Sequence, residues 1–265
     1  MDLPAKSARE PIFNVPFAVL GLVAVLCAIH AAMALLPADE RDALLDLFAF
    51  DPLRYVPSPP GEAWPGGVAA DAWTFVTYAF FHFNVIHLGF NLIWLVVFGT
   101  PVARRFGTWR FFAFFAFTAA AGALGHLVTH LGENVPAIGA SAAVLGMMAA
   151  ALRFVFQPAG PLDPAHIGHK DAYRVAAKPL IAMLRDRRML LFLLGWFGLS
   201  VAMAMPQFAM PGIDAAVAWQ AHIGGFVAGL VGFSAFDSVV PLPATAQSEP
   251  EEGAPPDDHP PLDPE

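Results

Sequence analysis

Six long apolar runs place the strongest limit on what this chain can fold into. They cover residues 13–36, 73–99, 109–131, 138–156, 189–205 and 215–236. None contains Asp or Glu, and their only Lys or Arg residues are Arg110 and Arg153, whose side chains we expect to reach the lipid headgroups. About 17–25 apolar residues are needed to cross a hydrocarbon core. The sequence therefore predicts an all-α membrane protein with six transmembrane helices.

Composition points to lipid and away from several other classes of protein. Hydrophobic residues make up 57% of the chain and charged residues only 14%, whereas soluble domains have roughly 45–50% and about 25%. The net charge of −8 provides no basic surface for nucleic acid. The single cysteine, Cys27, excludes an internal disulfide framework and a Cys-based zinc cluster. His126 and His130 have a metal-ligand spacing but no third ligand, so we expect no metal and no cofactor.

The distribution of basic residues predicts the orientation in the membrane. Of the 14 Lys and Arg residues, all but Arg41 and Arg54 fall in the N-terminus, the 100–110 connection or the segment 153–188. Lys and Arg accumulate on the cytoplasmic side, so both termini are predicted to be cytoplasmic. The loops predicted to lie outside are 37–72, 132–137 and 206–214.

The chain is expected to divide into three regions. They are a short cytoplasmic N-terminus (1–12), a six-helix domain (13–237) and a disordered, acidic, Pro-rich tail (238–265). The first apolar run is too long for a cleaved signal, so we expect it to be retained as a helix. Alternating apolar and acidic residues in the 37–72 loop predict a short helix in the membrane interface.

Ionisable or strongly hydrogen-bonding side chains are few within the apolar runs. We single out His30, His82, His87, Asn91, His126, His130, Ser141 and His222. Polar groups at this depth are costly unless partnered, so each is a candidate functional residue. At about 1.5 Å of helical rise per residue, His82, Ser141 and His222 reach a similar depth below the outer surface.

These residue types allow few catalytic mechanisms. No His-Glu-x-x-His string and no intramembrane carboxylate is present, which disfavours a metalloprotease and an aspartyl enzyme. Ser141 with His222 as general base remains, although small residues around Ser141 are by themselves more typical of helix packing. Asp237 lies about 22 Å beyond His222, so the predicted site is a dyad.

The residues resemble the rhomboid family of intramembrane serine proteases. The resemblance rests on HFNVIHLGFN (His82, His87, Asn91), GASA (Gly139 to Ala142) and AHIGGFVAG (Ala221 to Gly229), in that order along the chain. It implies a six-transmembrane-helix rhomboid-like bundle with an outward-facing cavity and both termini cytoplasmic. Ser141 would attack the scissile carbonyl and His222 would carry the proton.

The same resemblance implies roles for the supporting residues. His82, Asn91 and the backbone N–H of Ser141 would form the oxyanion hole, with His87 beside it. Gly139 would allow a close backbone approach, and Gly225 and Gly229 would bring the serine and histidine helices together. Three positions depart from the family pattern, namely Thr74, Ala142 and Leu145.

The resulting expectation is a protease that cuts single-pass transmembrane proteins near the outer face of a bacterial inner membrane, with the lipid bilayer as its other partner. The loop 206–214 would cap the site. One alternative is a catalytically inactive rhomboid-like binder of transmembrane clients. Another is a transporter or channel, which the apolar appearance of the inner half disfavours.

Overall fold

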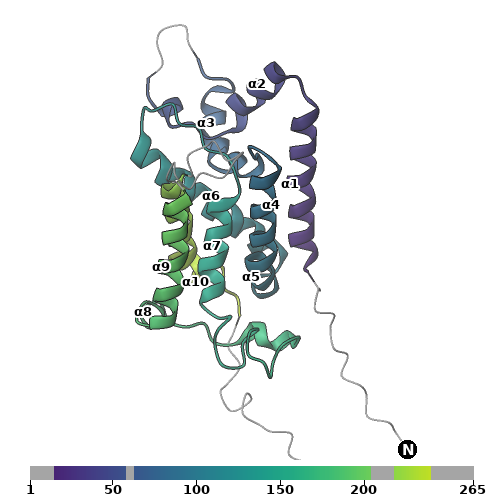
Figure 1. Cartoon of the computed structure of the whole chain (residues 1–265), viewed down its shortest axis with the longest axis vertical. Coiled ribbons are helices and arrows are strands. Elements are labelled where there is room, and N and C mark those ends of the chain that lie inside the picture. The colour runs from purple at the N-terminus through teal and green to yellow at the C-terminus, as the bar shows by residue number, and fades with distance from the viewer. Residues whose placement is uncertain (1–14, 58–62, 204–217, 240–265) are drawn as a thin grey trace, which may run out of the picture.

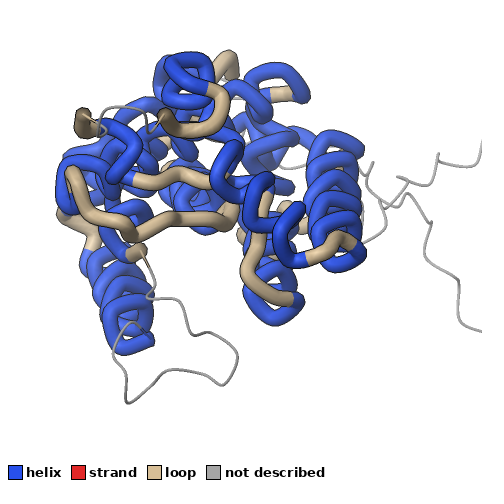
Figure 2. The backbone as a smooth tube through the Cα atoms, turned by 90° about the horizontal axis from the view of Figure 1, so that it is seen from above, coloured by secondary structure: helices blue, strands red, loops and turns tan. Residues whose placement is uncertain are grey.

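A computed structural model describes residues 15–57, 63–203 and 218–239. Within these ranges the chain forms helices and loops, and an isolated bridge joins Phe50 to Ala137 (Figure 2). The expected N-terminal segment (residues 1 to 12), the predicted cap 206–214 and the tail from residue 240 lie outside the described residues.

The helices form a bundle with different short helices at its two ends (Figure 1). The α-helices are α1 (Phe17–Leu35), α2 (Ala38–Phe48), α3 (Gly67–Thr77), α4 (Val85–Trp94), α5 (Thr100–Phe106), α6 (Thr108–His130), α7 (Ser141–Leu152), α8 (Leu180–Leu184), α9 (Arg187–Met203) and α10 (Trp219–Phe236). The 3-10 turns are η1 (Pro52–Tyr55), η2 (Tyr78–Phe80) and η4 (Lys170–Arg174), and a π-helical turn, η3 (Leu95–Gly99), joins α4 to α5. We call the two ends of the bundle the α2 end and the α8 end.

Three helical segments of the described chain are long and apolar enough to cross a membrane. They are α1, the continuous segment Val85–Phe106 and α6. The helices in the other predicted spans are shorter, with 12 residues in α7, 17 in α9 and 18 in α10. Six spans and their orientation therefore remain predictions. The short helix expected in the 37–72 loop is present as α2.

The run 73–99 is not one helix, so that predicted boundary was wrong. The helix that contains Trp73 begins at Gly67 and ends at Thr77, and a new helix begins at Val85. The cause is local, because the Asn84 side chain accepts a hydrogen bond from the backbone N–H of His87 at 2.8 Å. Such a cap satisfies a donor that the first helical turn leaves unpaired and so fixes where the helix starts.

Helix α7 is the centre of the bundle. Every residue from Ala142 to Leu152 is buried, and α6 and α10 pack against it through small residues. A Cβ on Gly225 would overlap the carbonyl oxygen of Ala142, and one on Gly229 would overlap that of Gly146. The backbones of α7 and α10 are therefore in direct contact, as small residues allow in membrane helices.

Two buried arginines organise the α8 end. Arg153 is only 7% exposed and donates to the carbonyls of Lys178 and Leu230, so the expectation that it reaches the headgroups was wrong. Arg105 donates to both carboxylate oxygens of Asp237, at 3.0 and 2.8 Å. The bundle is therefore not uniformly apolar at this end, because these guanidinium groups find carbonyl and carboxylate acceptors inside the protein.

Candidate active site

Ser141 and His222 meet at the α2 end of the bundle. Ser141 is the first residue of α7, and His222 lies in the first turn of α10. Both residues are half-buried, and His222 Nε2 lies 2.8 Å from Ser141 Oγ. The contact between Gly225 and Ala142, one residue after the serine, holds the two helices close enough for this bond.

The Ser141–His222 pair has no third member among the described residues. The Nδ1 atom of His222 is buried and has no hydrogen-bond partner in the ranges that the structure describes. A neutral imidazole that accepts a proton at Nε2 carries its own hydrogen at Nδ1. The geometry thus suits a hydroxyl that donates to Nε2, which is the arrangement needed to activate a serine.

His82 and His87 lie against the residues that directly precede Ser141 in the chain. His82 precedes α4, and the backbone N–H of Ala140 points to its Nε2 at 3.5 Å, a long hydrogen bond. The ring centroids of His82 and His87 lie 5.1 Å apart. Gly139 has φ +123°, and a Cβ there would lie 2.7 Å from His87 Cε1. Glycine is required at this position because of its positive φ angle and because the His87 ring leaves no room for a Cβ.

The Asn91 side chain forms a hydrogen bond within its own helix. Its side chain is buried on α4, and its Nδ2 donates to the carbonyl of His87 at 2.9 Å, one turn earlier in the same helix. No hydrogen bond joins Asn91 to Ser141 within the described chain. A carboxamide has two N–H donors, so one remains for another acceptor.

The loop that leads from α6 to Ser141 is held by residues that no motif in the sequence marks. The backbone N–H of Gly139 donates to the carbonyl of Tyr78 at 3.0 Å, and the Tyr78 hydroxyl donates to the carbonyl of Ala119. His126 Nε2 donates to the carbonyl of Val135 at 2.8 Å, which gives this histidine a structural partner. The available signal for Tyr78 was a phenol inside an apolar run, because its hydroxyl needs a hydrogen-bond partner when buried.

The three departures from the family pattern all lie at buried positions. Leu145 packs in a cluster with Met148 and Phe226. A Cβ added to Gly122 on α6 would lie 2.5 Å from the Cβ of Ala142, so a side chain there would not fit beside this alanine. Thr74 is fully buried, and its hydroxyl lies 2.9 Å from the hydroxyl of Tyr55.

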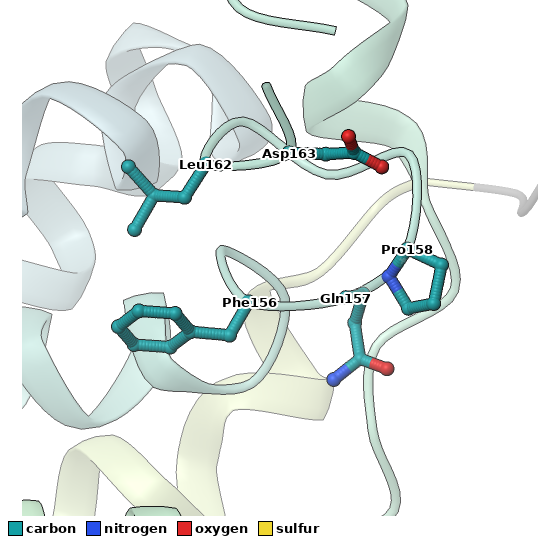
Figure 3. A pocket seen from close by; sticks show the side chains of 5 residues that line it. All are labelled: Phe156, Gln157, Pro158, Leu162 and Asp163. Carbon is teal, nitrogen blue, oxygen red and sulfur yellow. The ribbon is translucent and has the colours of Figure 1, made fainter. Parts of the chain in front are cut away.

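A surface cavity of about 360 Å³ lies away from Ser141. Figure 3 shows its lining side chains, which come from the loop after α7: Phe156, Gln157, Pro158, Leu162 and Asp163. The backbone N–H groups of Ala159 and Ala165 donate to the Asp163 carboxylate, which lowers the pKa of that group. Because Ser141 begins α7 and this loop follows the other end of α7, the cavity is separate from the site.

The cap on α4 gives a testable prediction. We expect Asn84→Ala to destabilise the protein by about 1 kcal/mol, because the N–H of His87 loses its acceptor. Asn84→Asp supplies an equally good cap and serves as the matched control. Thermal unfolding in detergent measures the effect, and equal melting temperatures for Asn84→Ala and Asn84→Asp would contradict the assignment of Asn84 as a cap.

Comparison with known proteins finds sequences similar to this chain. A family model described as the Rhomboid domain matches residues 69–236. A protein named Rhomboid protease GlpG from Enterobacter sp. (strain 638) is 44% identical over 48 residues, which cover 17% of this chain and 17% of that protein. A protein of the same name from Serratia proteamaculans (strain 568) is 32% identical over 69 residues, 26% of this chain and 24% of that protein. The matched stretches thus span a quarter or less of each relative.

Proposed function

The chain belongs to the rhomboid family, and from this premise we propose that it is an intramembrane serine protease in which Ser141 is the nucleophile and His222 the general base. The observation that supports the proposal most directly is the 2.8 Å approach of His222 Nε2 to Ser141 Oγ. A serine hydroxyl is a weak nucleophile until an adjacent base accepts its proton.

In the proposed reaction, every proton transfer passes through the imidazole of His222. Ser141 Oγ attacks the scissile carbonyl carbon while His222 Nε2 takes the hydroxyl proton. The same proton then passes to the leaving amine as the C–N bond breaks and the acyl-enzyme forms. His222 next takes a proton from a water molecule whose oxygen attacks the acyl carbon, and it returns that proton to Ser141 Oγ as the acyl group leaves. Positioned general acid–base catalysis of this kind contributes roughly 10²–10⁴-fold to the rate.

Donors for the oxyanion are proposed from three sources. The backbone N–H of Ser141 lies at the start of α7, where an α-helix leaves its first N–H groups unpaired. Asn91 retains a second N–H, and His82 can donate from Nδ1 when its Nε2 accepts from Ala140. Each donor aimed at the developing charge is worth about 3–4 kcal/mol in a water-poor site.

The proposed substrates are single-pass transmembrane proteins, cut close to the outer membrane face. A fully hydrogen-bonded helix does not offer its carbonyls to a nucleophile, so substrates should contain helix-weakening residues near the cleavage point. We propose six spans with both termini in the cytoplasm of a bacterial inner membrane. Single-cysteine labelling at Arg41→Cys from outside and at Lys170→Cys only after permeabilisation, in a Cys27→Ala background, tests that orientation.

Cleavage and labelling together test the activity. Reconstituted in lipid vesicles, the protein should cut a reporter transmembrane segment and react covalently with a fluorophosphonate probe at Ser141, identified by peptide mass spectrometry. Binding of the reporter with neither cleavage nor labelling would instead indicate an inactive rhomboid-like binder.

A further inference from the structure

The loop that carries Ser141 is paired with the chain around η1. The backbone N–H of Phe50 donates to the carbonyl of Ala137 at 3.2 Å, and the N–H of Ala137 donates to the carbonyl of Phe50 at 2.8 Å. The N–H of Gly132 donates to the carbonyl of Pro52 at 3.4 Å. Residues 50–52 therefore hold the backbone that enters Ser141, because Ala137 stands shortly before the serine in the chain.

The Phe50 side chain packs the paired segment into the protein interior. Its side chain is fully buried and lies 5.0 Å from the ring of Phe75 and 5.3 Å from that of Tyr55, measured between ring centroids. Aromatic pairs at these distances are favourable beyond the area that they bury. The position of the 132–137 backbone is thus set by how the segment 50–55 is held.

Arg54 holds that segment to three other regions of the chain. It lies in η1, and its side chain is 1% exposed. Its Nη1 donates to Asp71 Oδ1 on α3 at 3.1 Å, while its Nη2 donates to the carbonyls of Asp46 and Pro65, each at 2.9 Å. The guanidinium also lies over the ring of Trp64, 5.2 Å from its centroid.

This set of acceptors suits arginine specifically. A planar guanidinium presents several N–H donors in a fixed fork, whereas the ammonium of lysine is a compact point charge. Loss of the Arg54 fork would leave three acceptors without their donor.

The Asp51 side chain also stabilises the η1 turn, because it accepts a hydrogen bond from the backbone N–H of Leu53 at 2.9 Å. Burial raises the pKa of the Asp51 carboxyl.

We propose that Arg54 is a positioning residue for the nucleophile: by fixing η1 it fixes the backbone pairing of residues 50–52 with 132–137, and through that loop the placement of Ser141. The described contacts of Arg54 include neither Ser141 nor His222, and it takes no part in the chemistry. The inference rests on the proposed protease function. It makes activity depend on a residue that lies outside the motifs containing the serine and the histidine.

The test compares Arg54→Lys and Arg54→Gln with Arg41→Gln, a change at an exposed arginine on α2. The first readout is the fluorophosphonate labelling rate per folded molecule, with kcat and KM on the reporter substrate. We expect labelling and kcat to fall about tenfold or more in both Arg54 variants, with KM little changed, because small misplacements of reacting groups are costly. Arg41→Gln should match the parent, as surface changes usually do.

The second readout is hydrogen exchange, which separates positioning from a merely local structural role. Positioning predicts faster exchange at the amides of Gly132 and Ala137 in Arg54→Lys, even at a temperature where the variant is folded. A local role predicts faster exchange within 52–55 and 64–71 alone, with labelling of Ser141 unchanged, and that result overturns the inference. If Arg54→Gln does not fold, Arg54→Lys and Asp71→Asn are judged by the same two readouts. A parent protein that neither cleaves nor labels overturns the proposed function, and the positioning role with it.

Discussion

Ser141→Ala and His222→Ala should each reduce cleavage of a transmembrane reporter by on the order of 10⁴-fold or more, because residues of a nucleophile–base pair act as a unit and either loss removes the whole step. Fluorophosphonate labelling should disappear in Ser141→Ala, which lacks the reacting oxygen. It should fall to a background rate in His222→Ala, where the hydroxyl remains without its base. Initial cleavage rates and labelling in vesicles measure both effects.

Stability separates chemistry from misfolding in these variants. The hydrogen bond between His222 and Ser141 is one of many in the bundle, so its loss should cost about 1 kcal/mol, too little to unfold the protein. Ser234→Ala, at an exposed position of α10, and His169→Ala, at an exposed position before η4, are matched controls that should retain activity. Cleavage by the double variant Ser141→Ala/His222→Ala at the parent rate would show that the dyad is not the catalytic pair.

Gly225→Ala should damage both the packing of α10 on α7 and the candidate active site. The new Cβ would overlap the carbonyl oxygen of Ala142, and its three nearest neighbours would all be backbone atoms of that residue. Backbone cannot rotate away as a side chain can, so α10 must shift from α7. We expect a loss of about 1–3 kcal/mol in unfolding free energy from overpacking.

The effect on activity should exceed the effect on stability. A shift of α10 by a fraction of an ångström lengthens the distance from His222 Nε2 to Ser141 Oγ, and a displacement of about 1 Å can cost about a hundredfold in rate. Gly21→Ala on α1, where an added Cβ meets nothing within 4 Å, is the matched control and should cleave like the parent. Gly225→Ala that cleaves at the parent rate would mean that the α7–α10 contact does not set the dyad distance.

The sequence singles out the serine and the histidine that the structure brings together, because ionisable or strongly hydrogen-bonding residues are rare within the apolar runs. It was misleading about residues 73–99, because an apolar run has the same composition whether or not it is interrupted. The interruption depends on one side chain, Asn84, which caps α4 and leaves His82 outside regular helix. Asparagine three residues before His87 was a usable signal for this boundary.

The buried arginines show a second limit of sequence-based prediction. Arg153 stands near the end of an apolar run, where a long side chain commonly reaches the headgroups. Whether it does so depends on acceptors elsewhere, here the carbonyls of Lys178 and Leu230, which are distant in the chain. Arg54 is a similar case, because its acceptors belong to other segments that local patterns do not connect to it.

Helix α10 carries His222 and is synthesised late, because it lies near the C-terminal end of the described chain. Ser141 is translated well before His222, its proposed base, because 81 positions separate the two residues. Asp237, the carboxylate that accepts from Arg105, comes later still. A nascent chain therefore carries its proposed nucleophile through a long stretch of translation without the proposed base. Helix α10, the last of the described helices to be made, both packs onto α7 and carries the proposed base, so we expect a copy truncated before it to lack proteolytic activity.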